Sequence, residues 1–371
     1  MPVSIIGNSG IQFPDSSLQA AAASPFGLKN RIINGDMVIS QRNGTSSVTP
    51  TDGQYSLDRW KTGVTQTSKF SIQQNAGSIT PPAGFSNYLG ITSLSSYSVI
   101  STDEFEIFQQ IEGFNTADLA WGTANARTVT LSFWVRSSLT GTFGGCLFNS
   151  AINRSYVFSY TISSANTWEQ KSITIAGDTS GTWLGATNGT GIAVLFNIGA
   201  GASKTATAGA WNNAFFPAPT GQTSVVGTNG ATWYVTGVQL EVGSSATPFE
   251  RRLYNQELAN CQRYFISSYP DSVAINGNAG ALSGANFTAV SANDCAGANT
   301  FPVRMRATPT ITIYAPGGGS GTGTVRNASS GAIVSSVTTT NDANQFAFNR
   351  ISGSFTSGVV YSCQYLASAE L

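Results

Sequence analysis

The acidic residues that could perform acid–base chemistry crowd one short stretch of the chain, which holds Asp103, Glu104, Glu106 and Glu112. Enzymes that hydrolyse glycosidic bonds use two carboxyl groups about 5–9.5 Å apart. Side chains two residues apart on a strand share one face and lie about 6.6–7 Å apart, so Glu104 and Glu106 have a spacing that permits this chemistry. The two glutamates also alternate with apolar residues, as the solvent-exposed face of an ordinary strand does. We therefore interpret this stretch as structural and predict no catalytic residue in it.

Tryptophan side chains are the second group with chemical potential, because their flat faces can stack on the C–H groups of a sugar. Trp183 and Trp211 stand among glycine, threonine and asparagine residues, where turns are expected. They are the leading candidates for glycan contact, and Trp60 is a third. A structural role is the alternative for all three, and for Trp60 it is the preferred one. Trp134 and Trp233 lie within alternating strand patterns, which predicts that they pack in a core.

The composition excludes several other kinds of site. Lys plus Arg and Asp plus Glu are 18 each, so the formal net charge is +0 and no basic excess is present to neutralise nucleic-acid phosphates. Histidine is absent, which removes the usual proton shuttle near neutral pH and the commonest nitrogen ligand of zinc. Only 10% of the residues are charged, and a surface with so little charge suits a protein that works within an assembly.

Neither export, membrane insertion nor thiol chemistry has a clear signal in the sequence. The N-terminus lacks a basic segment followed by an apolar one, and no run approaches the ~18 apolar residues of a membrane-spanning helix. The four cysteines are scattered and form no C-x-x-C pair. They fit the role of small buried hydrophobic residues. A disulfide between Cys295 and Cys363 is an alternative that the sequence leaves open.

The fold that must position these residues is predicted to be mainly β. From residue 28 to residue 246, apolar and polar residues alternate in many short runs, as in Leu131, Phe133 and Val135. Asn-Gly pairs and other turn signals separate the runs, and no helical pattern intervenes. This arrangement predicts an antiparallel jelly-roll β-sandwich. Residues 1–27 are too few to fold alone, and we expect them to form an arm that needs a partner surface.

A single amphipathic helix is predicted over residues 247–265. Thr247 and Glu250 have the spacing of a capping box, and Pro248 would occupy the first helical position. Two arrangements suit such a helix, packing on the sandwich or pairing with copies of itself at an oligomer axis, and the sequence favours neither. Its apolar stripe comprises Leu253, Leu258, Cys261 and Phe265.

The last part of the chain, residues 266–371, returns to strand patterns and predicts a smaller C-terminal β domain. It contains the glycine-rich run 317–323. Because loops on a rigid β scaffold commonly carry recognition, this run is a candidate receptor-binding tip.

Several short motifs resemble those of tailed-bacteriophage fibre and appendage proteins. Residues 10–19 are similar to an N-terminal element of tail fibres, with Ser16 where that element has glycine. Residues 30–37 and 55–60 look like the opening of a phage-encoded jelly-roll module, and residues 246–265 look like its close. The resemblance implies a virion protein that assembles as a homotrimer.

The same resemblance implies a role for each end of the chain. The N-terminal arm would attach to phage tail or baseplate proteins through Ile11, Phe13, Pro14 and Leu18. The last residues, 367–371, are similar to the C-termini of fibres.

A second resemblance connects the sandwich with jelly-roll carbohydrate-binding modules. Residues 131–136 and 232–241 are similar to two inner strands of those modules, which often carry a structural calcium. The resemblance implies a calcium site at Asn34 and Asp36. The aspartate that such modules place before the final strand is replaced here by Thr236 or Gly237.

Together these features predict a non-enzymatic tail fibre or receptor-binding appendage that attaches the phage to host surface polysaccharide. We expect it in the virion, after assembly in the host cytoplasm, with no nucleic-acid partner, no membrane insertion and no cofactor beyond the calcium. Two alternatives stay open. One is a head-decorating or tail-adaptor protein that makes only protein contacts, and the other is a polysaccharide depolymerase that uses Glu104 and Glu106.

Overall fold

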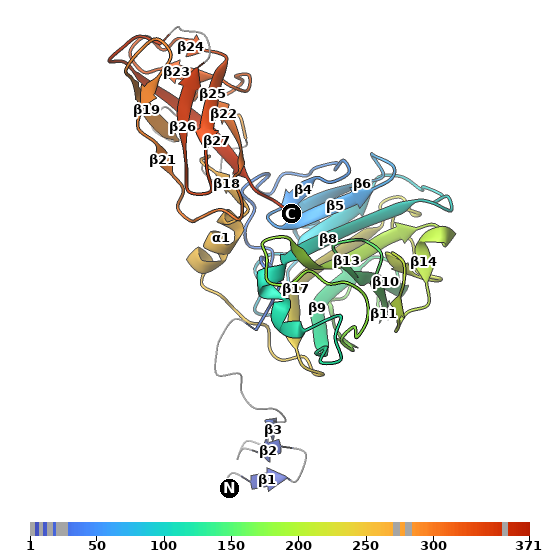
Figure 1. Cartoon of the computed structure of the whole chain (residues 1–371). Helices are drawn as coiled ribbons and strands as arrows, with labels where there is room; N and C mark the ends of the chain where they lie inside the picture. Colours follow the sequence, from blue (N-terminus) through green and yellow to red (C-terminus); the bar gives the residue numbers. More distant parts are fainter. Residues whose placement is uncertain are drawn as a thin grey trace.

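The computed structural model describes residues 29–269, 275–278, 284–350 and 355–371, together with the strand residues 4–6, 10–12 and 18–19. Figure 1 shows a β-sandwich, a smaller β domain at one end of it, and the helix α1 (Tyr254–Gln262) at their junction. Among the described residues, the strand pairs of both domains are antiparallel, except for one two-residue pair of the sandwich that is parallel. The structure confirms the predicted class, a mainly β chain with a jelly-roll sandwich, a connecting helix and a smaller C-terminal β domain.

The larger sheet of the sandwich has seven strands, in the spatial order β15-β11-β10-β13-β8-β5-β4. The pairing of β13 with β8 contains a register shift between Asn197 and Gly199, which bends the strand locally. In spatial order the strands are β15 (Trp211–Asn212), β11 (Ser155–Ile162), β10 (Gly141–Asn149), β13 (Thr190–Ala200), β8 (Glu104–Glu112), β5 (Trp60–Val64) and β4 (Tyr55–Leu57).

The smaller sheet has five strands, in the order β12-β9-β17-β7-β6. These are β12 (Glu169–Ile175), β9 (Val129–Ser137), β17 (Thr232–Val242), β7 (Leu89–Ser93) and β6 (Phe70–Gln74). Alternate residues of β9, Leu131, Phe133 and Val135, are fully buried in the core between the two sheets. Trp233 joins them there, as predicted. The same prediction is wrong for Trp134, which the strand period turns to the outer face, where it is half-buried.

Short elements lie in the connections of the sandwich. They are the parallel pair β14 (Thr205–Ala206) and β16 (Ala218–Pro219), and the 3-10 turns η2 (Ala76–Ser78), η3 (Gly113–Asn115), η4 (Ala117–Leu119) and η5 (Ala202–Lys204). η3 lies against the loop formed by residues 176–189, because the N–H groups of Gly113 and Phe114 donate to the carbonyl oxygens of Gly189 (2.8 Å) and Thr187 (2.9 Å).

The C-terminal domain is built around one central strand, β27 (Val360–Ser368), and a second, smaller sheet. β27 pairs with β18 (Phe265–Ser267), β19 (Ala285–Ala289), β22 (Thr310–Tyr314) and β23 (Val325–Asn327), and the short strands β20 (Cys295–Ala296) and β24 (Ile333–Val334) extend this sheet. The second sheet has the order β21-β26-β25, with β21 (Asn299–Thr300), β26 (Gln345–Arg350) and β25 (Val337–Asn341). Phe287, Phe346 and Tyr361 are among the buried residues of a core separate from that of the sandwich.

All four cysteines are free thiols. Cys146, Cys261 and Cys363 are buried, as expected for small hydrophobic residues, and Cys295 is half-buried. The structure therefore answers the question that the sequence left open, because Cys295 and Cys363 form no disulfide.

The helix is shorter than predicted and begins at Tyr254. The groups expected to cap it are used elsewhere. The Thr247 hydroxyl donates to Glu241 Oε2 (2.6 Å), and Glu250 Oε2 accepts the N–H of Asn30 (2.6 Å). These bonds tie the segment before the helix to the sandwich, so the predicted capping box is wrong.

The predicted apolar stripe also does not form a single helix face. Cys261 is buried, but Phe265 lies in β18, beyond the helix. Leu253 precedes the helix and is 80% exposed, and Leu258 is half-buried. The residue that the helix buries one turn before Cys261 is Glu257, whose carboxylate binds backbone and side-chain groups of its surroundings.

At the N-terminus, β1 (Ser4–Ile6), β2 (Gly10–Gln12) and β3 (Leu18–Gln19) form a three-stranded antiparallel sheet. Ile11 and Leu18 belong to paired strands of this sheet, whereas Phe13 and Pro14 lie outside the described residues. The attachment role of these four residues stays a prediction.

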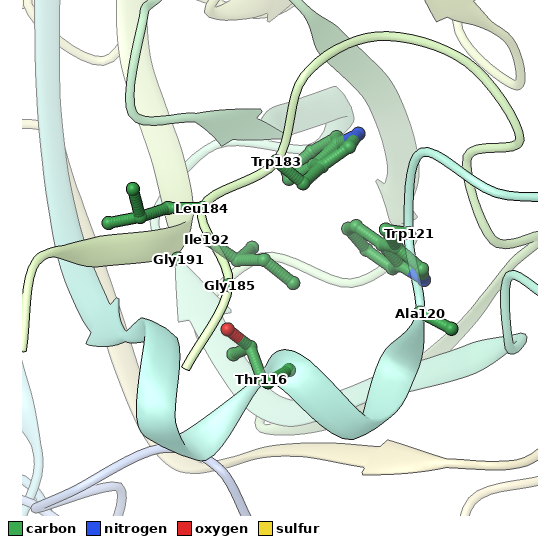
Figure 2. Close-up of a pocket in the computed structure, with 9 residues that line it drawn as sticks. Thr116, Ala120, Trp121, Trp183, Leu184, Gly185, Gly191 and Ile192 are labelled. Carbon is green, nitrogen blue, oxygen red and sulfur yellow. The ribbon is translucent and has the colours of Figure 1, made fainter. Parts of the chain in front are cut away.

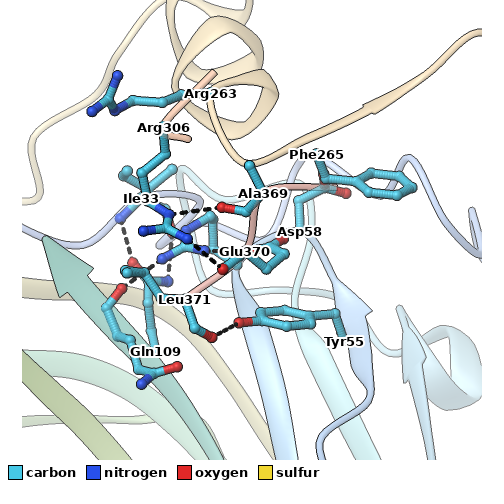
Figure 3. Close-up of polar contacts among 12 residues, drawn as sticks. Ile33, Tyr55, Asp58, Gln109, Arg263, Phe265, Arg306, Ala369, Glu370 and Leu371 are labelled. Atoms are coloured by element: carbon cyan, nitrogen blue, oxygen red, sulfur yellow. Dashed lines mark hydrogen bonds and ion pairs between the residues drawn. The ribbon is translucent and has the colours of Figure 1, made fainter. Parts of the chain in front are cut away.

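A buried polar network joins the sandwich to the C-terminal domain (Figure 3). Glu370 forms ion pairs with Arg42 (2.8 Å) and with Arg59, and its side chain is 8% exposed. The Tyr55 hydroxyl donates to the carbonyl oxygen of Leu371 (2.8 Å). The junction therefore rests on charged and polar side chains that are shielded from water.

Four of the motifs singled out in the sequence meet at this junction, namely residues 30–37, 55–60, 246–265 and 367–371. They lie far apart along the chain, yet hydrogen bonds and ion pairs connect them. These contacts fasten the segment around the helix and the end of the chain to the sandwich.

Candidate functional site

A small open pocket of about 60 Å³ lies where η3 and η4 meet the 176–189 loop and the start of β13. In Figure 2 the indole rings of Trp121 and Trp183 stand on one side of the hollow, and the hydroxyl of Thr116 points toward it from the helical turns. This volume is well below the ~300–1,000 Å³ of sites that enclose a drug-sized molecule, so a ligand would lie partly outside the pocket. The wall is formed by Thr116, Ala117, Ala120, Trp121, Trp183, Leu184, Gly185, Gly191 and Ile192.

Three tryptophans brace one another beside the pocket. The ring centre of Trp121 lies 4.8 Å from that of Trp183 and 5.2 Å from that of Trp211, and all the rings are nearly perpendicular. The Trp121 and Trp211 N–H groups donate to the backbone oxygens of Arg127 (2.8 Å) and Ala176 (2.9 Å). Edge-to-face packing with bonded N–H groups fixes the ring orientations, so the aromatic wall is formed before any ligand arrives.

A buried ion pair positions two of these rings. Arg154 donates two hydrogen bonds to Asp178, at 2.7 and 2.6 Å, and its guanidinium carbon lies 5.8 Å from the ring centre of Trp211. Asp178 Oδ2 also accepts the Trp183 N–H (3.0 Å). Burial alone would raise the pKa of Asp178, but the hydrogen bonds from Arg154 and Trp183 outweigh it and lower that pKa below its usual value. The carboxylate is therefore charged at neutral pH and holds both neighbours.

Two glycines allow the walls of the pocket to approach each other. A Cβ atom on Gly191 would lie 2.1 Å from Thr116 Oγ1, and one on Gly113 would lie 2.0 Å from the carbonyl oxygen of Gly185. Any larger residue would push η3 away from the loop. Glycine at these positions follows from close backbone approach.

The wall of the pocket suits an uncharged ligand that has both a C–H face and hydroxyl groups. The partly exposed ring of Trp183 can stack on the apolar face of a sugar ring. Trp121 and Thr116 are buried, and the Thr116 hydroxyl lies 3.4 Å from the carbonyl oxygen of Glu112, so it keeps acceptor capacity for a ligand that reaches it. None of the wall residues has an ionisable side chain, so the pocket has no group that could act as a general acid or base. Apolar surface continues beside it at Phe114 of η3, which is 57% exposed.

The structure separates the three predicted sugar-binding tryptophans. Trp183 lines the pocket, and Trp211 supports it from behind. Trp60 is fully buried, and its N–H donates to the carbonyl oxygen of Asn34 (3.0 Å), so it cannot contact a glycan and the structural role preferred for it is confirmed. Sequence reasoning missed Trp121 and Thr116. The glycine and threonine after Trp121 are a turn signal of the same kind as those around Trp183.

The carboxylates that suggested hydrolysis do not line the pocket. Glu106 is buried rather than solvated, and burial together with Glu104 raises its pKa well above the usual value. Glu104 is half-buried and pairs with Lys204 (2.9 Å). Glu112 holds Arg263, on the segment after α1, through two hydrogen bonds of 2.7 and 2.8 Å. The interpretation of this stretch as an exposed strand face is therefore wrong for Glu106.

The donor set at the expected calcium site does not fit the ion. Asn34 is fully buried, and its amide donates to the carbonyl oxygens of Ile39 (2.8 Å) and Asp58 (3.0 Å). Asp36 lies half-buried in a small pocket that also contains Glu250, Glu257 and the cationic side chain of Arg252. The two glutamates accept the backbone N–H groups of Asn30 and Asn34, and Glu257 also pairs with Arg252 (3.1 Å). Calcium takes 6–8 oxygen ligands. Among the residues whose side chains are described, no group of three or more His, Cys, Asp or Glu residues is arranged to hold a metal ion.

Comparison with known proteins gives similarities of fold at low sequence identity. No family model matches the chain, and no curated protein matches it. Within the described part of the chain, no helix has both the length and the apolar character needed to cross a membrane.

Several solved structures are similar to the sandwich. A putative sugar-binding protein from Bacteroides thetaiotaomicron aligns with a TM-score of 0.34 and 12% identity, over 58% of this chain and 100% of that one. The family 11 carbohydrate-binding module from Clostridium thermocellum, in complex with a β-1,3-1,4-mixed-linked tetrasaccharide, aligns with a TM-score of 0.29 and 12% identity, over 55% and 99%. The enzymatically active domain of tailspike protein 4 from bacteriophage CBA120 aligns with a TM-score of 0.32 and 11% identity, over 58% of this chain but only 22% of that one.

Proposed function

We propose that the sandwich binds polysaccharide through the tryptophan-lined pocket and catalyses no reaction. The observation that carries this proposal is the wall of the pocket, which combines the partly exposed Trp183 ring and the Thr116 hydroxyl with no ionisable side chain. Such a wall offers stacking and hydrogen bonds to a sugar ring but no group for proton transfer. The pocket is too small to enclose a sugar ring, so a sugar would contact it from the open side and the affinity of a single site is expected to be low.

We propose further that the chain is a phage tail fibre or comparable receptor-binding appendage that assembles as a homotrimer. The resemblance of its motifs supports this role, as do the formal net charge of +0 and the arrangement of two β domains. Its N-terminal strands would attach to tail or baseplate proteins. Several linked copies raise the effective concentration of weak sites, so attachment to a host surface would be strong in sum.

In this proposal the protein resides in the virion as a tail appendage after assembly in the host cytoplasm. Binding through the pocket requires no cofactor. The partners are further copies of the chain, tail proteins and host surface polysaccharide, and neither nucleic acid nor a membrane interior is among them.

An array of bacterial capsular and O-antigen polysaccharides, probed with the full chain displayed on beads, tests the proposal. We expect binding by the natural chain and a loss of about tenfold or more in affinity for Trp183→Ala, because removal of a central aromatic contact is costly. Trp168→Ala is the matched control. Trp168 is a half-buried tryptophan outside the pocket, whose N–H donates to the Thr80 carbonyl oxygen (2.9 Å), and we expect this variant to bind normally.

Two outcomes would overturn the proposal. No binding at high multivalency would favour a head-decorating or adaptor protein that makes only protein contacts. Release of new reducing ends from a bound polysaccharide would favour a depolymerase.

A further inference from the structure

One arginine of the C-terminal domain contacts both the end of the chain and the pocket loop. Arg306 Nε and Nη2 donate to the carbonyl oxygens of Ala369 (2.7 Å) and Glu370 (2.8 Å), as Figure 3 illustrates for the first of these bonds. Its Nη1 donates to the carbonyl oxygen of Asn188 (2.8 Å), and the Asn188 amide donates back to the Arg306 carbonyl oxygen (3.0 Å). The two residues thus form a reciprocal pair across the domain junction.

Asn188 stands in the same loop as the pocket residues Trp183, Leu184 and Gly185. The first half of this loop is held within the sandwich, by the Asp178 contacts described above and by Asn149, whose Nδ2 donates to the Thr182 carbonyl oxygen (3.0 Å).

The second half of the loop is held differently. Its hydrogen bonds to the sandwich are made to η3, through the carbonyl oxygens of Thr187 and Gly189. η3 is followed directly by Thr116 and Ala117, which line the pocket, so these bonds hold the loop against the segment that carries that side of the pocket. The reciprocal pair of Arg306 and Asn188, called the clamp below, ties this half of the loop to the C-terminal domain.

We propose that Arg306 is a positioning residue for the pocket, so that docking of the C-terminal domain and sugar binding are coupled. The part of this inference that concerns sugar binding rests on the proposed function. The guanidinium is charged under all relevant conditions and offers fixed, planar donors, which suits it to hold three carbonyl oxygens in one geometry. Coupling of this kind is reciprocal, so a sugar in the pocket would strengthen the domain junction by the same factor as the junction strengthens sugar binding.

Hydrogen exchange on the full chain tests the coupling without any ligand. The reporters are the amides of Gly113 and Phe114, because they donate to loop carbonyl oxygens. We expect Arg306→Ala to raise their exchange rates about tenfold, since hydrogen bonds from a charged donor are lost. Arg304→Ala, at an exposed arginine two positions away, is the matched control and should leave the rates unchanged.

Arg306→Ala also removes the bonds to Ala369 and Glu370, so a second variant isolates the clamp. Asn188→Ala deletes only the amide bond to the Arg306 carbonyl oxygen, and we expect a smaller rise, about threefold. If neither variant changes exchange at Gly113 and Phe114, the coupling is disproved.

The polysaccharide array described above then tests the effect of Arg306 on sugar binding. Binding by the natural chain that Arg306→Ala weakens about tenfold, with Arg304→Ala unaffected, supports the positioning role. If the affinity of Arg306→Ala for the polysaccharide equals that of the natural chain, Arg306 has no effect on sugar binding. Absence of binding by the natural chain refutes the proposed function, while the exchange result still decides whether the clamp acts on the loop.

Discussion

The guanidinium of Arg59 lies 3.5 Å above the centre of the Tyr264 ring, and both side chains are withdrawn from solvent. Arg59 stands between β4 and β5 of the sandwich, whereas Tyr264 precedes the first strand of the C-terminal domain. A cation held over an aromatic ring inside the protein still needs an anionic partner, because burial of an unpaired charge is costly. Glu370 supplies that partner, so three distant parts of the chain meet at one buried charge.

Glu370→Gln removes the negative charge that both Arg42 and Arg59 face. We expect the free energy of unfolding to fall by about 3 kcal/mol, because a buried arginine is left without its partner. Urea denaturation followed by tryptophan fluorescence measures the change. Asp118→Asn breaks the half-exposed ion pair with Arg31 and should cost less than about 1 kcal/mol. Equal effects of the two variants would contradict the account of the junction.

Asp178→Asn should make the sandwich less stable at neutral pH than at acid pH, relative to the natural chain. The pKa of Asp178 is lowered in the folded state, so its contribution is complete above the ordinary value of 3.8 and is lost as the pH falls below that value. We expect a difference of about 3 kcal/mol at pH 7 between natural chain and variant that narrows near pH 3. Urea denaturation at both pH values measures it. A difference that is the same at both would show that the carboxylate charge does not hold Arg154 and Trp183.

Glu106→Gln should have the opposite dependence. Burial raises the pKa of Glu106 above 4.5, and Glu104 and Asp52 add to this, while Lys204 and Asn197 oppose it. The folded state therefore prefers the protonated acid, and stability is lost as the pH rises above 4.5 toward the folded pKa. We expect the variant to be more stable than the natural chain by at least about 1 kcal/mol at pH 8, with no gain at pH 4.

Thermal unfolding at the two pH values measures the effect of Glu106→Gln. Gln110→Glu, at a half-buried position of the same strand β8, is the control, because it adds a carboxyl group instead of removing one. A variant that is less stable at pH 8 would contradict the expected sign. Glu106→Gln also tests catalysis. If the natural chain releases reducing ends from a polysaccharide and this variant does not, Glu106 is identified as a catalytic acid.

Leu253→Glu tests the proposed homotrimer. Leu253 is 80% exposed beside the start of α1, and a charge there would be buried without a partner if the helices of three copies met. Light scattering of the natural chain should give three times the mass of one chain, and the variant should dissociate at micromolar concentration. Ile100→Glu, at a residue that is 57% exposed on the sandwich, should leave the trimer intact. A natural chain that is monomeric at these concentrations would exclude the trimer.

The sequence predicted only part of the candidate site. Trp183 was identified because glycine and threonine residues around it indicate a turn, and turns lie at the surface. Trp60 was kept as a third candidate although a structural role was preferred, because its hydrogen-bond partner, Asn34, lies in a separate segment of the chain. Thr116 gave no signal, since its role depends on the loop that faces it across the pocket.

The amino-acid sequence by itself determined the class of fold and the alternation of strands such as β9, because a strand turns alternate residues to opposite faces whatever surrounds it. The prediction of a buried Trp134 did not follow that alternation and was wrong. It also determined that no histidine could serve a reaction. Only the tertiary structure decided that Thr247 and Glu250 bind the sandwich instead of capping the helix, and that Glu106 is buried. Hydrogen bonds and burial of this kind join residues far apart in the chain, and their free energies depend on which segments the fold brings together.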